Sequence, residues 1–170
     1  MKKTYISFGV TLTIIIFSFS TSFAQATATA TASATIVTPI SISKTVDMNF
    51  GNVAVTGTAG TVILAPAGTR TTTGGVTLPA VTGTVAAASF AVAGQGAYTY
   101  AITLPSSALT ITSGSNNMTV NAFTSTPSTT GALTSGAQTL NVGATLNVAS
   151  GQPAGTYISA TPFSVTVNYN

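Results

Sequence analysis

Apolar and hydroxyl-bearing residues alternate with a period of two along residues 26–50, and this pattern restricts the fold more than any other feature. Every even position in it is apolar except Thr38 and Lys44. Successive side chains of a strand point to opposite faces, so the alternation predicts strands with one apolar face. One unbroken strand would extend about 80 Å at ~3.3 Å per residue, which is too long for a single domain. Pro39, which has no N–H for a ladder, is the expected break.

Shorter runs with the same period continue to the C-terminus, separated by glycine, proline, serine and asparagine. No helical period or change of composition interrupts them, so we expect one domain over residues 36–170. We predict an all-β, Ig-like or pilin-like β-sandwich of about 7–10 short antiparallel strands, with an extended N-terminal strand at 25–35. The expected domain strands are 36–42, 46–55, 61–65, 75–78, 89–92, 97–104, 109–112, 118–122, 138–142, 145–148 and 163–169.

The N-terminus has the organisation of a signal peptide, residues 1–24. Two lysines precede an apolar stretch at 6–19, and the small residues Ser22 and Ala24 fit a cut before Gln25. A cut two residues later and an uncleaved anchor are the alternatives. The apolar stretch is too short to span a membrane. We therefore expect an exported protein with no membrane span after cleavage, extracellular at the cell surface (in a fimbrium) or in the periplasm.

Charged side chains are nearly absent from the mature chain. After removal of the signal peptide only Lys44, Arg70 and Asp47 remain, two positive charges and one negative charge, for a net charge of +1. A nucleic-acid partner would need a basic patch, so we expect none. A surface with so few charges gives little repulsion between copies, which suits a protein that assembles.

The residue types for catalysis are missing. The chain has no histidine or cysteine, and Asp47 is its one carboxylate side chain. A Ser-His-Asp triad, a pair of catalytic carboxylates and a zinc site are therefore all excluded. We expect no enzyme activity, no catalytic residue, no cofactor and no metal site.

Three residues have both a structural and a functional interpretation. Lys44 interrupts the apolar row, and we interpret it as a guard of an edge strand against aggregation. An ion pair with Asp47 and an amide crosslink to an asparagine are the alternatives. Tyr98 and Tyr100 share one face of an expected strand, which favours core positions over stacking on a sugar ring.

The segment 25–34 carries the most functional information, because it alternates like a strand and has no obvious partner within the domain. Adding it to the sheet edge of a neighbouring copy would satisfy its backbone groups, and head-to-tail addition gives an open filament. A self-paired first strand and a flexible linker are the alternatives. The predicted assembly residues are those of the apolar row: Ala26, Ala28, Ala30, Ala32, Ala34 and Ile36.

Several segments resemble the bacterial family called domain of unknown function 4402. They are ATATATASATIVTPISISKTVDMNFGNVAV, GTVILAPAG, NNMTV, LNVGATLNVASGQPAGTY and FSVTVNYN. The motif positions are Asn49, Phe50, Gly51, Val53, Gly143, Leu146, Gly155, Tyr157 and Tyr169. The family is similar in layout to chaperone-assembled fimbrial subunits, which implies an Ig-like sandwich with a penultimate tyrosine. Members usually read Tyr-Ser-Gly-Thr-Phe near the end, whereas residues 157–163 here contain an insertion, which predicts a bulge at the start of the last strand.

The sequence favours a secreted structural surface protein, a pilin-like or fimbria-like subunit that assembles by β-strand addition. Its expected partners are further copies or other surface subunits, with a periplasmic chaperone and an usher as candidates. The first alternative is a monomeric secreted adhesin or carbohydrate-binding module. A small outer-membrane β-barrel is a remote alternative, since most of the expected strands are shorter than the ~9–11 residues that such barrels use.

Overall fold

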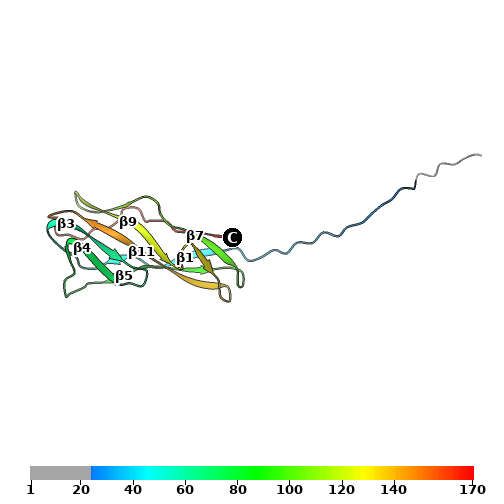
Figure 1. Ribbon diagram of the computed structural model, residues 1–170, viewed down its shortest axis with the longest axis horizontal. Coiled ribbons are helices and arrows are strands. Elements are labelled where there is room, and N and C mark those ends of the chain that lie inside the picture. Colours follow the sequence, from blue (N-terminus) through cyan, green and yellow to red (C-terminus); the bar gives the residue numbers. More distant parts are fainter. Residues whose placement is uncertain (1–23) are drawn as a thin grey trace, which may run out of the picture. The chain divides into compact units, whose positions relative to one another are not determined.

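The computed structural model describes residues 24–170, in which every regular element is a β-strand (Figure 1). The chain divides into two units, with the boundary between Thr35 and Ile36. In the first unit, residues 24–35 are exposed and belong to no helix or strand. The predicted signal peptide lies, apart from Ala24, outside the described residues. Among the described residues, no helix is long and apolar enough to cross a membrane.

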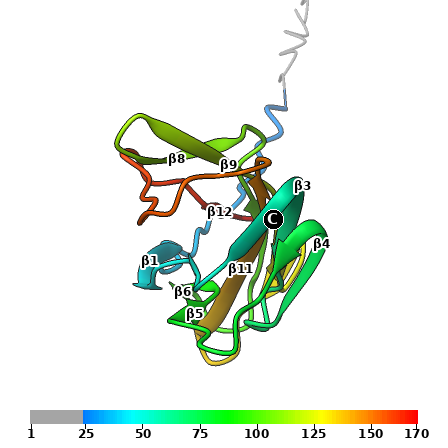
Figure 2. The same cartoon turned by 90° about the vertical axis from the view of Figure 1, so that its left-hand side faces the viewer.

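The larger sheet of the second unit has seven antiparallel strands. Five follow the order β1-β6-β11-β3-β4, while β9 also pairs with β11 and β8 pairs with β9. Their bounds are β1 Ser41–Val46, β3 Ala54–Leu64, β4 Arg70–Thr77, β6 Ala88–Ala93, β8 Leu109–Ser113, β9 Asn116–Thr126 and β11 Ala137–Val148. In the end-on view of Figure 2, the β8–β9 and β3–β4 hairpins lie on different sides of β11.

Strand β11 organises this sheet. Residues 137–142 pair with β6 and residues 144–148 pair with β3, while β9 pairs with residues 141–147. Because β9 overlaps both of the other partners, β6 and β3 lie end to end along the opposite side of β11. The change of partner occurs at Gly143, where an added Cβ would contact the Leu64 carbonyl oxygen. The prediction of two strands flanking Gly143 is therefore wrong: the glycine admits a close backbone approach within one strand.

The smaller sheet has the order β10-β7-β12, and a short ribbon joins β2 to β5. The bounds are β2 Asn49–Phe50, β5 Val85–Ala86, β7 Thr99–Thr103, β10 Thr130–Ala132 and β12 Thr166–Tyr169. The predicted all-β, antiparallel fold is confirmed, with sheets arranged as in a sandwich. The described part of the chain has twelve strands, three of which contain only two or three residues.

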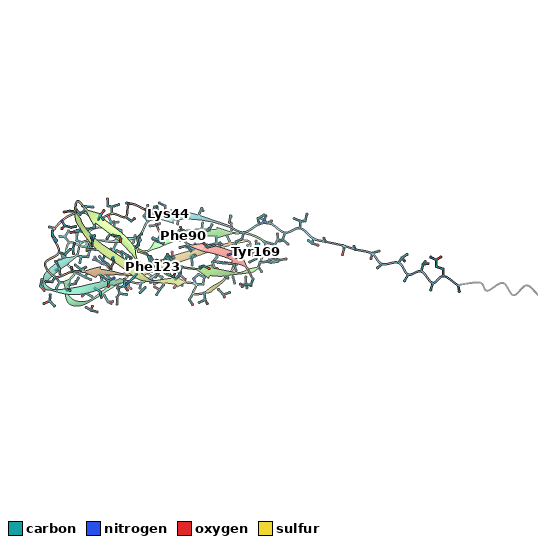
Figure 3. All side chains as sticks on the ribbon, turned by 90° about the horizontal axis from the view of Figure 1, so that it is seen from above. Lys44, Phe90, Phe123 and Tyr169 are labelled. Atoms are coloured by element: carbon teal, nitrogen blue, oxygen red, sulfur yellow. The ribbon has the colours of Figure 1, made fainter. Side chains whose placement is uncertain are left out.

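Two clusters of apolar side chains form the core. The first joins the two sheets and contains Ala88, Val92, Tyr100, Leu133, Leu140, Val142 and Val167. The second lies inside the curved larger sheet and contains Val62, Val76, Val120, Ala144, Leu146 and Val148. Phe123 and Met48 pack against both clusters, and Figure 3 shows Phe123 and Phe90 in the middle of the domain. The phenyl ring of Phe163 contacts both phenylalanines, with centroids 5.0 Å from Phe123 and 6.4 Å from Phe90.

Several of the expected strands begin or end elsewhere, and for the first two the structure shows the reason. The strand predicted at 36–42 starts only at Ser41, and Ile36 is 97% exposed and outside any strand. Thr38 does not join the sheet, because its backbone groups bond to the side chains of Gln95 and Tyr169 instead. The strand predicted at 46–55 is interrupted after Phe50, because Gly51 has a φ of 67°, which ends a ladder.

Candidate functional site

The predicted assembly residues lie on a fully exposed stretch of chain. Ala26, Ala28, Ala30, Ala32 and Ala34 are all exposed within the first unit, and Ile36 is exposed at the start of the second. None of them belongs to a strand in the described chain. Their alternation with threonine and serine places the alanines on one face whenever this stretch is extended.

The domain begins at a junction of three residues that are far apart in the sequence. The Thr38 N–H donates to Gln95 Oε1 at 3.1 Å, and the Thr38 carbonyl accepts from the Tyr169 hydroxyl at 2.8 Å. The Tyr169 hydroxyl also accepts from the Gln95 N–H at 2.6 Å. We call this set of three residues the Thr38 junction. Both backbone groups of Thr38 are therefore satisfied by side chains rather than by a β-ladder.

Neighbouring residues leave the Tyr169 side chain little freedom. Its ring meets Tyr98 edge to face, with centroids 5.5 Å apart. An added Cβ at Gly94 would contact the Tyr169 hydroxyl and come within 3.0 Å of Leu133 Cδ1. The penultimate tyrosine therefore serves to fasten the chain that enters β1 to the last strand (Figure 3).

The motif at residues 49–53 forms a tight turn that is bonded to a distant loop. The Gly51 N–H donates to Asn49 Oδ1 at 2.8 Å, and the positive φ of Gly51 suits glycine. The Asn52 N–H donates to the Thr82 carbonyl at 2.7 Å, and its Nδ2 donates to the Val81 carbonyl at 3.0 Å. This turn therefore holds the loop that precedes β5.

Arg70 completes the same turn from β4. Its Nη1 donates to the carbonyls of Phe50 and Asn52, which fixes the backbone on both sides of Gly51. The side chains of Phe50 and Val53 pack against the second core cluster. The guanidinium group of Arg70 thus holds the turn that contains four of the motif positions: Asn49, Phe50, Gly51 and Val53.

The motif at residues 155–157 closes a turn against β8. Tyr157 donates through its hydroxyl to the Pro153 carbonyl at 2.8 Å and accepts from Gln152 Nε2 at 2.8 Å. An added Cβ at Gly155 would lie 2.5 Å from Ser113 Oγ. Gly143 and Leu146 contribute elsewhere, within β11, so the structure does not bring all motif positions into one site.

The last segment changes sheets through an irregular stretch. The backbone groups of Ile158 bond to those of Thr112 at 2.9 and 3.0 Å, an isolated bridge to β8. The chain then bends at residues 160–161 and pairs with β7 only from Thr166 onward. The bulge predicted at the start of the last strand is therefore not found: β12 pairs with β7 in regular register, and the insertion forms a bend instead.

Tyr98 and Tyr100 do not form an aromatic platform. Tyr100 is fully buried and donates to Gln138 Oε1 at 2.8 Å, and burial raises the pKa of its phenol above the ordinary value of 10.0. Tyr98 precedes β7 and is 46% exposed. The core prediction is therefore confirmed for Tyr100 and wrong for Tyr98, which packs on Tyr169 at the domain end.

Lys44 lies in β1, which is an edge strand of the larger sheet. Its Nζ is 2.7 Å from both carboxylate oxygens of Asp47, and both side chains are largely exposed. The edge position is as expected, and the ion pair is one of the two alternatives. An exposed pair of this kind contributes little to stability.

Two hollows on the surface of residues 24–170 are candidate sites for a metal or a small molecule, and both are shallow. Among the residues that the structure describes, no group of three or more His, Cys, Asp or Glu could hold a metal ion. Two shallow hollows of about 240 and 320 Å³ lie beside the ends of β9 and β11 and beside β8. Their linings are Asn117, Met118, Thr119, Asn147, Val148 and Ala149 for the first, and Ala108, Leu109, Thr110, Thr112, Ala160 and Thr161 for the second.

A family model described as "Domain of unknown function (DUF4402)" matches residues 40–169. This chain belongs to that family. No curated protein and no solved structure matches it. The DUF4402 match spans all nine motif positions predicted from the resemblance, and it begins after the six predicted assembly residues.

Two residues of this DUF4402 domain make long-range hydrogen bonds at these sites that the sequence does not predict. Gln95 lies between two glycines, and its partners Thr38 and Tyr169 are 57 and 74 positions away in the sequence. Arg70 is one of the two cationic side chains of the mature chain, and no local pattern marks its hydrogen bonds to the turn at Gly51. Both roles depend on chain segments that meet only in the folded domain.

Proposed function

We propose that the mature chain is a secreted structural subunit of a cell-surface fibre. It assembles when residues 25–34 of one copy add as a β-strand to a sheet edge of another copy. The observation that carries this proposal is the state of residues 24–35, which are exposed throughout and outside any helix or strand, although their sequence alternates like a strand.

The backbone supplies most of the expected affinity. A strand in water leaves a row of N–H and C=O groups unpaired along each side, and a sheet edge of another chain can pair them. The alanine side chains bury little area each, so they fit a shallow acceptor and add modest apolar stabilisation. Alternation then fixes the register by keeping the alanines on the side of the acceptor's core.

The domain presents edges that can receive such a strand. Within residues 36–170, β1, β4, β10 and β12 each pair with a single neighbouring strand. Lys44 and Arg70 are the only cations of the mature chain, and Lys44 is paired with Asp47. Copies therefore repel one another weakly. Since the donor strand and the acceptor edge are different surfaces, repeated addition is heterologous and produces an open filament.

The cellular setting belongs to the same proposal. A chain with an N-terminal signal peptide reaches the periplasm, where a chaperone would shield the acceptor edge before an usher adds the subunit to the fibre at the cell surface. Other surface subunits are expected partners in the same way, because the donor contributes mainly backbone hydrogen bonds, which any compatible edge can pair.

Deletion of residues 25–34 tests the proposal. The mature chain should form filaments that electron microscopy detects, and the shortened chain should remain folded and form none. Unchanged filaments after the deletion would reject strand addition through this segment. A chain that stays monomeric at every concentration and instead binds glycans on an array would favour the adhesin alternative.

A pair of matched variants makes the test specific for a strand. Ala28→Lys with Ala32→Lys places two charges on the apolar face, whereas Thr29→Lys with Thr31→Lys places the same charges on the opposite face. The first variant should abolish assembly because it would bury two charges against the acceptor. The second should retain assembly. Equal loss in both would point to a general charge effect and against the proposed face.

A further inference from the structure

The Thr38 junction bears on which domain can accept residues 25–34. Thr38 uses its N–H on Gln95 and its carbonyl on Tyr169, and Ser41 begins β1 three residues later. To pair with the edge of β1 or β12 in its own domain, the chain must reverse direction between Ala34 and Ser41. The junction holds part of that stretch in place.

Pro39 further restricts the positions at which the chain can reverse direction. Pro39 fixes its own φ near −65°, and its ring disfavours helical backbone angles at Thr38. A reversal at these two residues would also break both backbone hydrogen bonds of Thr38. Ile40 packs against the first core cluster, so residues 35–37 are the positions left for a turn.

Residues 35–37 are poor turn formers. Thr35, Ile36 and Val37 are all β-branched. Tight hairpin turns of the favoured types need positive φ angles, which Gly, Asn and Asp provide and β-branched residues resist. The chain between the segment and the domain is thus suited to an extended conformation over its whole length.

We infer that the Thr38 junction and the β-branched run 35–37 prevent residues 25–34 from pairing with β1 or β12 of their own domain, the edge strands that adjoin the junction, so the acceptor is a second copy of this chain. This inference rests on the proposed function. Gln95 and Tyr169 are positioning residues in it, since they act on the donor segment only through Thr38.

Two matched double variants of the mature chain test the inference. Val37→Gly with Tyr169→Phe frees φ at position 37 and removes the hydroxyl from the junction. Val37→Thr with Tyr157→Phe is the control, since it keeps a β-branched residue at position 37 and removes a tyrosine hydroxyl that also makes two hydrogen bonds, outside the junction. Amide hydrogen exchange at residues 27–33 is measured in dilute, monomeric protein, and filament formation is measured at higher concentration.

The first variant should gain protection at residues 27–33 while monomeric and should assemble less well. If nine-tenths of its molecules pair with themselves, the apparent affinity for a second copy falls about tenfold. Wild type and control should show no protection there. Exchange in β6 and β11 reports whether the domain remains folded, so a folding defect is recognised separately.

Two results would overturn the inference: protected amides at residues 27–33 in monomeric wild type, or a first variant that exchanges and assembles like the control. The deletion of residues 25–34 separates this failure from that of the proposed function. Filaments that survive the deletion reject the proposed function. If the deletion abolishes filaments while the first variant assembles like the control, only the present inference falls.

Discussion

The hydroxyl of Tyr169 donates to the carbonyl of Thr38 at 2.8 Å, although the two residues lie 131 positions apart. One side chain in the last strand thereby holds the chain that leads into the first strand. Because the same oxygen accepts from the Gln95 N–H, the contact also includes the turn after β6. The two ends of the domain and one of its turns are joined at a single atom.

Removal of that oxygen should destabilise the domain measurably. Tyr169→Phe keeps the edge-to-face contact with Tyr98 but loses two hydrogen bonds, each of which contributes about 1 kcal/mol net. We expect the free energy of unfolding in urea to fall by about 1–2 kcal/mol. Tyr157→Phe loses bonds within an exposed turn and should cost less. A larger loss for Tyr157→Phe would contradict the importance of the junction.

Gly143 should tolerate no side chain. An added methyl group would meet the Leu64 carbonyl oxygen, where β11 changes partner from β6 to β3, and neither backbone can move away without breaking its ladder. Gly143→Ala should therefore cost about 2–4 kcal/mol in thermal or urea unfolding. Gly57→Ala is the matched control, because its added methyl group has no heavy atom within 4 Å. It should change stability by less than about 1 kcal/mol.

Replacing Arg70 by lysine should destabilise the turn around Gly51. A guanidinium nitrogen donates to the carbonyls of Phe50 and Asn52, and the flexible, shorter-reaching ammonium of lysine lacks that planar geometry. Arg70→Lys should lower the free energy of unfolding by about 1–2 kcal/mol and speed amide exchange at Asn52. Lys44→Gln removes the other cation, from an exposed ion pair, and should cost at most about 0.5 kcal/mol. Equal effects of the two changes would indicate that charge alone matters.

The features that could be predicted from the sequence are those fixed by local periodicity. The alternation of apolar and polar residues around Ile42 and Phe90 predicts antiparallel strands and shows which side chains face the core. The isolated cation Lys44 predicts an edge strand. Such features depend only on neighbouring residues along one strand.

Features that depend on a distant partner could not be predicted. In the sequence, Gly143 has the residue type expected between two strands. Only its contact with Leu64 in the folded domain shows that it lies within one strand. Tyr98 shares the period of Tyr100, yet it precedes β7 and packs on Tyr169 instead of entering the core. The hydrogen bonds of Gln95 span 57 and 74 positions, and no local pattern encodes them.

The buried phenol of Tyr100 should make the folded domain less stable at alkaline pH. Burial raises its pKa in the folded domain above the ordinary value of 10.0, which the unfolded chain retains. Between these two pKa values the folded state holds a proton that the unfolded state releases, so stability is fully present below pH 10 and falls as the pH rises above it.

Urea unfolding at pH 8, 10 and 11 measures this dependence against Tyr100→Phe, which leaves Gln138 Oε1 bonded to the Ala132 N–H. The variant should be slightly less stable at pH 8 through the lost hydrogen bond, and its stability should fall less steeply above pH 10. The difference in slope should be at most about 1.4 kcal/mol per pH unit, the limit for one proton. Parallel curves for wild type and variant would show that Tyr100 ionises equally easily in the folded and unfolded chains, which its burial between β7 and β11 argues against.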